Sequence, residues 1–412
     1  MLETLGKRAK EASRILAETS EQDKNRALNA MADALLSCAP QILEANALDC
    51  EKAEKDGMSR AFLDRLRLSD ARISSMADAL REVAALPDPV GRILEDKTRP
   101  NGLHIVKIAV PLGVIGVIFE ARPNVTADSA ALCLKSGNAV ILRGGSDAIL
   151  SNTAVCKALR MALKDSGLPE DCVQLVEDTS RESATALMRL SDYLDVIIPR
   201  GGAGLIRAVV QNATVPVIET GTGVCHIYVD READIEMAAK IIHNAKTSRP
   251  SVCNAAECIL VHSAIAEKAL PVIAKALESP KVEIRGDMRA CQILPSIVPA
   301  QDDDWGREYG DLILACRVVD SMDEALAHIR AYGTGHSEAI ITENADTAAV
   351  FLESVDAAAV YHNASTRFTD GGEFGLGAEI GISTQKLHVR GPVGLRELCS
   401  MKYKIYGEGQ IR

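Results

Sequence analysis

The feature that most limits the fold of this chain is the alternation, between Val114 and Val229, of short apolar runs with longer stretches of helical character. These runs are Val114–Phe119, Ala139–Leu142, Cys172–Val176, Val196–Ile198 and Val215–Ile218. A second series follows Arg231, with runs at Cys258–Val261, Leu312–Ala315, Ala339–Ile341 and Ala357–Val360. Strands that alternate with helices predict βαβ units and parallel sheets covered on both faces. We therefore expect an α/β protein with doubly wound sheets.

The chain is long enough for more than one such sheet. It has 412 residues, of which 47% are hydrophobic, and single cores stop growing near ~250 to 300 residues. Before Leu86 the apolar residues recur at helical spacing, which predicts several amphipathic helices. Pro87–Gly91 breaks this pattern, and Leu103–Val110 then alternates as an exposed-edge strand or the arm of a hairpin does.

Charge and cysteine usage exclude several classes of function. The 46 basic and 57 acidic residues give a formal charge of −11, which disfavours a general affinity for nucleic acid or for an anionic membrane. The 11 cysteines form no C-x-x-C pair and the histidines do not cluster along the sequence, so we expect reduced thiols, a cytoplasmic protein and no metal site. The amino-terminal residues carry charges throughout and do not resemble a signal peptide. The apolar stretch Ile108–Phe119 is shorter than the ~20 residues that a bilayer span needs.

Cys253 is the strongest candidate nucleophile because it lies among small and polar residues, in SRPSVCNAAE from Ser248 to Glu257. Lys246 and Arg249 precede it, and a nearby cation stabilises the thiolate. The alternative is that Cys253 is one more small buried side chain, as most cysteines are.

Two further segments support a catalytic reading. Val114–Phe119 ends in a polar tip that includes Asn124, whose side-chain NH2 suits a developing oxyanion; the alternative is an asparagine that serves only the turn after proline. The run VIETGTG places Glu219 before two glycines and 34 residues before Cys253.

This order of asparagine, glutamate and cysteine resembles the aldehyde dehydrogenase superfamily and, within it, the branch that reduces γ-glutamyl phosphate with NADPH in proline biosynthesis. The resemblance covers essentially all 412 residues. The matching strings are FEARPNVT at Phe119–Thr126, LKSGNAVILRGGSDA at Leu134–Ala148, SRPSVCNAAE around Cys253 and STRFTDGGEFGLGAEIGIST at Ser365–Thr384.

The resemblance implies an aldehyde dehydrogenase-like fold with two doubly wound domains and a β-hairpin arm. Residues 1–97 and 114–225 would form the cofactor-binding domain, and residues 226–383 the catalytic domain with the cysteine. Residues 98–113 and 384–412 would form an oligomerisation arm, which in the family pairs with the carboxy-terminal segment of a partner subunit. We therefore expect a homo-oligomer.

The resemblance also implies NADP(H) as the cofactor, at three places. Arginine beside glycines and a serine after the run Ala139–Leu142 suits a 2′-phosphate and favours NADP over NAD. The turn PRGGAG resembles the family's phosphate-binding turn, although alone it does not fit the GxGxxG fingerprint. Glu308 resembles the glutamate that binds the nicotinamide ribose. The expected cofactor-binding residues are Arg143, Gly144, Ser146, Arg200, Gly201, Gly202 and Glu308.

The implied chemistry is acyl transfer coupled to hydride transfer. Cys253 attacks L-glutamyl 5-phosphate, Asn124 and the Cys253 backbone N–H hold the oxyanion, and a thioester is reduced to L-glutamate 5-semialdehyde. Glu219 either tunes the Cys253 thiol or handles protons around phosphate, as suits a reductase; the alternative is a salt-bridged structural carboxylate. The expected substrate-binding residues are Arg122, Arg249, Asn363, Ser365, Thr366 and Arg367.

Three alternatives remain open at this point. A hydrolytic NAD(P)-dependent semialdehyde dehydrogenase shares Asn124, Glu219 and Cys253 but needs no phosphate. A cysteine hydrolase needs a histidine base near Cys253, for which His226, His243 and His262 are near in sequence. A catalytically silent oligomeric binding protein would not bind the cofactor. For the favoured reading we expect a glutamate 5-kinase on a separate chain, in transient contact at most.

Overall fold

The computed structural model describes residues 2–412, which form two compact units. Unit 1 runs to Thr220 and also contains Gly375–Gly381 and Val393–Arg412. Unit 2 contains Gly221–Phe374 and Ile382–Pro392. Each unit has its own parallel sheet with helices, so the prediction of an α/β protein with two doubly wound sheets is confirmed.

The sheet of unit 1 has four parallel strands in the order β5-β4-β3-β6. These are β3 (Val114–Phe119), β4 (Ala139–Arg143), β5 (Val173–Leu175) and β6 (Val196–Arg200). All six residues of β3 are buried, as expected for a central parallel strand with helices on both faces. The predicted run Val215–Ile218 adds only one bridge, between Ile197 and Val217.

Unit 1 contains nine α-helices among the residues that the structure describes. The first five precede the strands, as predicted: α1 (Leu2–Glu18), α2 (Glu21–Ser37), α3 (Ala39–Lys55), α4 (Arg60–Leu66) and α5 (Asp70–Ala85). The others connect or follow them: α6 (Asn124–Lys135), α7 (Ile149–Asp165), α8 (Arg181–Met188) and α9 (Ala203–Asn212), with short 3-10 turns at Ser146–Ala148 and Glu170–Cys172. Ser20, Ser69 and Ser180 cap three of these helices by accepting a backbone N–H three residues on.

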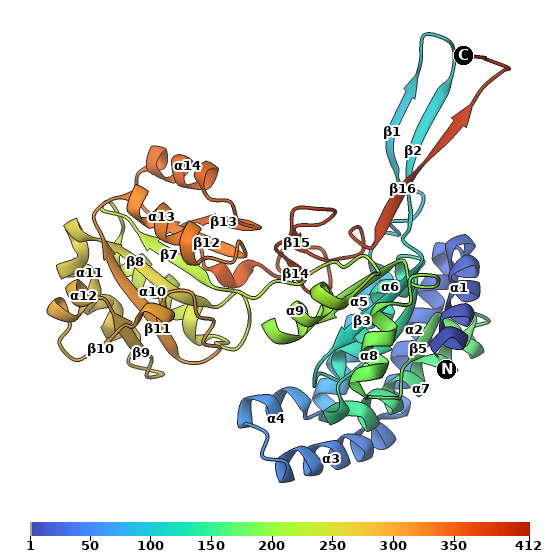
Figure 1. Cartoon of the computed structure of the whole chain (residues 1–412), viewed down its shortest axis with the longest axis horizontal. Helices are drawn as coiled ribbons and strands as arrows, with labels where there is room; N and C mark the ends of the chain where they lie inside the picture. Colours follow the sequence, from blue (N-terminus) through green and yellow to red (C-terminus); the bar gives the residue numbers. More distant parts are fainter. Residues whose placement is uncertain (1) are drawn as a thin grey trace. The chain divides into compact units, whose positions relative to one another are not determined.

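A long antiparallel ribbon extends from unit 1 (Figure 1). It consists of β1 (Ile93–Thr98), β2 (His104–Pro111) and β16 (Cys399–Tyr406) in the order β1-β2-β16. The hairpin arm was predicted correctly, but β2 is the central strand and not an exposed edge. The sequence around β2 could not predict this second partner, because β16 comes from the far end of the chain.

The sheet of unit 2 has seven parallel strands in the order β10-β9-β11-β8-β7-β12-β13. These are β7 (Cys225–Val229), β8 (Ala256–His262), β9 (Glu283–Gly286), β10 (Val298–Pro299), β11 (Ile313–Val319), β12 (Ser337–Ile341) and β13 (Ala359–His362). Two short strands, β14 (Ile382–Ser383) and β15 (Gly391–Pro392), form a separate antiparallel pair.

Helices cover both faces of this sheet (Figure 1). They are α10 (Ile235–Thr247), α11 (Ser263–Ala276), α12 (Met288–Ile293), α13 (Met322–Tyr332) and α14 (Ala345–Ser354), with 3-10 turns at Asp302–Asp304 and Thr366–Phe368. Ile227 packs in the core under α10 and α11, whereas its neighbour Tyr228 packs in the core under α13 and α14. This alternation along β7 follows from the period of two in a strand.

No helix within residues 2–412 combines the length and the apolar character that crossing a bilayer demands. No disulfide joins any of the 11 cysteines in this part of the chain.

Candidate active site

Cys253 lies in unit 2, on the turn that joins the end of α10 to the start of β8. It is half-buried, whereas eight of the 11 cysteines are buried. Burial raises the pKa of such thiols, for example that of Cys156 to about 12. Its exposure therefore distinguishes Cys253 from the eight buried cysteines, and it shares this exposure with Cys38 and Cys291.

The turn is backed by Gly223 and Cys225. A side-chain carbon at Gly223 would collide with the carbonyl of Cys253, so the last glycine of VIETGTG is required by this close approach. The thiol of Cys225 donates to the same carbonyl, with Sγ 3.2 Å from the oxygen. Gly223 and Cys225 together fix the backbone that carries Cys253, the predicted nucleophile.

Asn254, the next residue, fastens this turn to the Ser365–Thr369 loop. Its side chain is 4% exposed, and its Nδ2 donates to the carbonyls of Arg367 (3.2 Å) and Thr369 (3.0 Å). Arg367 donates to its Oδ1, and the Thr366 hydroxyl donates to its backbone carbonyl at 2.7 Å. The predicted substrate loop and the cysteine turn are thus one hydrogen-bonded unit.

Two arginines belong to this constellation. Arg367 is partly buried and its Nε donates to Ser248 Oγ at 3.0 Å. Burial lowers its pKa, and the neighbouring Arg249 guanidinium lowers it further, whereas Cys253 acts in the opposite direction. The Arg367 guanidinium therefore interacts with both the Arg249 guanidinium and Cys253, and such a group can bind an anion. Lys246, in contrast, is not a spare cation, because it is paired with Glu257.

The remaining residues of the predicted substrate loop serve its shape. The hydroxyl of Ser365 accepts from the Arg367 backbone at 3.3 Å. Asn363 has a positive φ of 54° and exchanges two 3.0 Å hydrogen bonds with the backbone of Thr342. Its amide therefore holds β13 beside the end of β12.

Asn124 is the first residue of α6 in unit 1, just after the polar tip of β3. Its Nδ2 donates to Asp128 Oδ2 at 2.9 Å, one helical turn on. Burial raises the pKa of Asp128 to about 6. Arg122 lies in the same tip, where its backbone N–H donates to the Glu120 carbonyl at 2.7 Å.

Arg143 is the last residue of β4, and only part of its guanidinium group is hydrogen-bonded to the neighbouring loop. Its Nη2 donates to the carbonyls of Thr179 (2.6 Å) and Ser180 (3.0 Å), while its buried Nε has no hydrogen-bond partner among the described residues. A side chain at Gly144 would collide with Asn152. Ser146 begins the following 3-10 turn. The Nε–H of Arg143 therefore has a free donor position in the part of the chain that the structure describes, and Gly144 beside it has no room for a side chain. Both features suit the binding of an anionic group.

The turn from Arg200 to Gly202 lies between β6 and α9, where helix N–H groups face an acceptor. The Gly202 N–H donates to a carboxylate oxygen of Glu120 at 3.0 Å. A side-chain carbon at Gly201 would lie 2.7 Å from the same carboxyl group. Glu120 therefore shows that this turn accepts a negative charge, and a phosphate would have to displace it.

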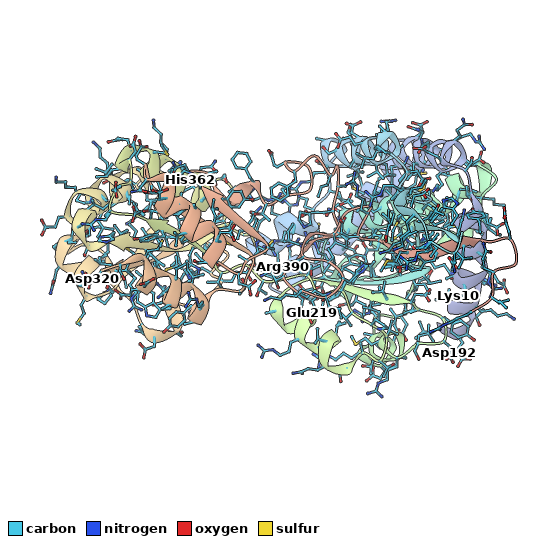
Figure 2. The ribbon with its side chains drawn as sticks, turned by 90° about the horizontal axis from the view of Figure 1, so that it is seen from above. Lys10, Asp192, Glu219, Asp320, His362 and Arg390 are labelled. Atoms are coloured by element: carbon cyan, nitrogen blue, oxygen red, sulfur yellow. The ribbon has the colours of Figure 1, made fainter. Side chains whose placement is uncertain are left out.

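The two predicted glutamates lie in different units. Glu219 follows α9 near the end of unit 1, where it is labelled in Figure 2. Glu308 lies in unit 2, and its Oε1 accepts from the Gly223 N–H at 3.2 Å. Because Gly223 backs the Cys253 carbonyl, Glu308 is linked to the cysteine turn through this one residue.

The structure thus gathers the predicted residues into two groups. Unit 2 brings together Cys253, Arg249, Ser365, Thr366, Arg367 and Glu308, and it also holds Asn363, which is hydrogen-bonded to Thr342. Unit 1 holds Arg122, Asn124, Arg143, Gly144, Ser146, Arg200, Gly201, Gly202 and Glu219. Sequence reasoning missed Asn254, Glu120 and Glu257. All three lie within the matched strings beside predicted residues, but only their contacts distinguish them.

A buried cluster in unit 2 was not visible from sequence spacing. Ligand-type atoms of His226, Cys258 and His328 lie within 4.8 Å of one another. Arg317 donates to Nδ1 of His328 at 3.2 Å, and burial lowers the pKa of that ring to about 3. The neutral ring therefore carries its proton on Nε2, which faces Cys258 as a donor and not as a metal ligand.

Comparison with known proteins extends over the whole chain. Residues 2–311 match the model of the aldehyde dehydrogenase family. The chain is 60% identical over 407 residues to the gamma-glutamyl phosphate reductase of Heliobacterium modesticaldum, covering 99% of this chain and 98% of that protein. It is 60% identical over 411 residues to the enzyme of that name from Moorella thermoacetica, covering 100% and 98%.

Solved structures agree with this result. The crystal structure of gamma-glutamyl phosphate reductase from Thermotoga maritima has a TM-score of 0.97 at 51% identity, covering 100% of this chain and 99% of that one. An acetylating aldehyde dehydrogenase from Geobacillus thermoglucosidasius has a TM-score of 0.73 at 18% identity, covering 100% and 97%, and shares the fold.

Proposed function

The chain belongs to the aldehyde dehydrogenase family and, within it, to the gamma-glutamyl phosphate reductases, and we propose that it reduces L-glutamyl 5-phosphate to L-glutamate 5-semialdehyde and phosphate. This is the second step of proline biosynthesis from glutamate. The observation that carries the proposal is the 60% identity over the full length of curated relatives of that name.

The reaction begins at the Cys253 thiolate. It attacks the acyl carbon of the substrate, the bond to phosphate breaks, and a thioester remains on the protein. Arg367 interacts with both Cys253 and Arg249, and we assign these two arginines to the departing phosphate and the substrate carboxylate, with Thr366 and Ser365 shaping the loop. Arg122 of unit 1 is assigned to the same anionic groups.

The oxyanion that forms at each step requires hydrogen-bond donors. We assign the backbone N–H of Cys253 and the Nδ2 of Asn124 to this role. In the structure this amide donates to Asp128. The proposal therefore includes the exchange of this partner for the oxyanion when substrate binds.

NADPH, when bound, supplies the hydride that reduces the thioester carbon. The residues of unit 1 fit such a group, since Arg143 has an orphaned buried N–H and the Arg200–Gly202 turn already accepts a carboxylate. We assign Arg143, Gly144 and Ser146 to the 2′-phosphate side and the turn to the pyrophosphate. Glu308 is assigned to the nicotinamide ribose, which requires it to release Gly223.

Glu219 does not activate water in this proposal, because water would waste the acyl intermediate. Glu219→Gln is expected to slow turnover while thioester still forms on Cys253. Mass spectrometry of the protein after mixing with acyl phosphate measures this directly. A variant on which no acyl-enzyme accumulates would contradict this role for Glu219.

The arm of β1, β2 and β16 is proposed to join subunits of a homo-oligomer. Met401, Tyr403 and Ile405 of β16 are each more than half exposed, and they alternate onto one face of the ribbon. An edge strand with exposed apolar side chains pairs readily with another chain.

The decisive experiment follows NADPH formation from glutamate 5-semialdehyde and NADP⁺, with and without phosphate, in wild type and in Cys253→Ala. The phosphorylating mechanism requires both phosphate and Cys253 for turnover. Steady turnover without phosphate would instead identify a hydrolytic semialdehyde dehydrogenase. Parallel assays with NAD⁺ measure the cofactor preference.

A further inference from the structure

One buried ion pair in unit 2 is not explained by the residues assigned above. Lys246 Nζ lies 2.6 Å from Glu257 Oε2, and their side chains are 0% and 1% exposed. Removing two charges from water is costly, and two well-packed apolar residues often serve stability as well. Stability alone therefore does not explain why this pair is buried so deeply.

The two residues close the base of the cysteine turn. Lys246 is in the last turn of α10, and Glu257 is the second residue of β8. They are 11 residues apart in the chain, and Cys253 lies between them. The pair consequently joins the two elements that flank the turn.

The same pair also holds the segment that follows Glu308. Glu257 uses its second oxygen, Oε1, to accept from the Gly310 N–H at 3.3 Å. Lys246 Nζ lies 5.8 Å from the centroid of the Tyr309 ring, within the range of a cation–π contact. Gly310 has a φ of 63°, which favours glycine at this bend.

We propose that Lys246 and Glu257 are positioning residues for hydride transfer, which hold the Glu308–Gly310 segment in register with the turn that carries Cys253. This inference rests on the proposed function, in which Glu308 binds the nicotinamide ribose and Cys253 carries the thioester. Both must be correctly placed, because a displacement of about 1 Å at a reacting centre costs up to about 100-fold in rate.

The electrostatic surroundings agree with this role. Burial raises the pKa of Glu257 to about 7, opposed by Lys246, and the Glu308 carboxylate raises it further. Burial lowers the pKa of Lys246, opposed by Glu257, Asp311 and Cys225. Ionisation of Glu257 as the pH rises through about 7 completes the pair.

Glu257→Gln tests the inference because the amide places an acceptor oxygen at only one of the two carboxylate positions, those that face Lys246 and Gly310, and removes the negative charge. In the cofactor-free protein, we expect faster amide exchange at residues 308–311. In the burst of NADPH formed from semialdehyde and NADP⁺ without phosphate, which isolates hydride transfer, we expect a slowing of about 10- to 100-fold. The pH dependence of the burst near pH 7 should disappear.

The rate at which iodoacetamide alkylates Cys253 distinguishes a loss of positioning from a general disruption of the site. In Glu257→Gln this rate should stay close to that of wild type. The double variant Lys246→Met/Glu257→Met removes both charges and should recover thermal stability, while the burst stays slow because Gly310 has lost its acceptor. Lys24→Met breaks a comparably buried pair with Asp88 in unit 1 and serves as the matched control. It should lower the melting temperature without changing exchange at residues 308–311.

Three results would overturn the inference. These are a Glu257→Gln burst equal to that of wild type, alkylation slowed by the same factor as the burst, or a double variant with a normal burst. If wild type itself forms no NADPH, the proposed function fails, and amide exchange at residues 308–311 still reports whether the pair holds this segment.

Discussion

At the scale of single residues, the candidate site is defined by close approaches as much as by reactive groups. Gly223 has no room for a side chain because the Cys253 carbonyl lies against it. The side-chain amide of Asn254 is fully hydrogen-bonded: its Nδ2 donates to the carbonyls of Arg367 and Thr369, and its Oδ1 accepts from the Arg367 guanidinium. Cys253 is thereby held on a rigid turn, which the proposed reaction at a fixed distance from a cofactor requires.

Gly223→Ala is expected to destabilise the protein by about 1 to 3 kcal/mol, the usual cost of overpacking, and to slow alkylation of Cys253 because the turn must shift. Thermal unfolding and iodoacetamide kinetics measure the two effects. Gly204→Ala, in α9 and without any atom within 4 Å of the added carbon, is the control and should be neutral or slightly stabilising. Equal behaviour of the two variants would contradict this account of the turn.

Asp128 predicts a pH dependence of stability. Its pKa is raised from 3.8 to about 6 in the folded chain, first because of burial. Below pH 3.8 the Asp128 carboxyl is protonated in both the folded and the unfolded chain, so it does not reduce the free energy of unfolding. As the pH rises through about 6, the folded chain must bury a carboxylate that the unfolded chain leaves in water, and stability is lost.

Asp128→Asn should therefore stabilise the protein above pH 6 by about 1 kcal/mol, after discounting for solvent screening, and make no difference near pH 4. Urea unfolding across this pH range measures the difference. Glu11→Gln on the exposed face of α1 is the control. A gain that persists unchanged at pH 4 would point to packing and not to charge.

At the scale of elements, the strands were predictable and most of their partners were not. Short apolar runs predicted β3, β4, β8 and β12 because parallel strands covered on both faces are apolar throughout. Val215–Ile218 reads in the same way, yet it forms a single bridge. Hydrophobicity predicts that a segment is buried, but it does not establish that a ladder forms.

In the candidate site, too, single residues could be predicted from the sequence, whereas their contacts could not. Cys253, Asn124 and Glu219 were found from local strings, and the roles assigned to them remain proposals. The contacts of Asn254 with Thr369 and of Glu120 with Gly202 join residues 115 and 82 positions apart. Such pairings depend on how the sheets bring loops together, which periodicity along the chain does not contain.

The ribbon of β1, β2 and β16 carries its own prediction. Ile405→Lys places a charge on the exposed apolar face of β16 and should weaken subunit association by about 10-fold or more. Light scattering coupled to size exclusion measures the mass as a function of concentration. Lys402→Gln, on the opposite face of the same strand, is the control; an unchanged mass for Ile405→Lys would exclude this face from the interface.

At the scale of the whole molecule, the two units predict a local response to cofactor. NADP⁺ at about 100 times its Kd should stabilise the chain by about 2.7 kcal/mol. Hydrogen exchange should slow at residues 143–146 and 200–202 of unit 1, while α11 in unit 2 serves as the internal reference. Equal protection by NAD⁺ at the same concentration would contradict the assignment of Arg143 to a 2′-phosphate.

The chain passes between the units at four junctions, 220/221, 374/375, 381/382 and 392/393. Unit 1 is therefore completed only by the last 20 residues, Val393–Arg412, which contain β16. On the ribosome, β2 emerges nearly three hundred residues before its partner and presents a bare edge throughout that interval. A copy whose synthesis stops between β2 and β16 is therefore left with an unpaired strand edge in unit 1.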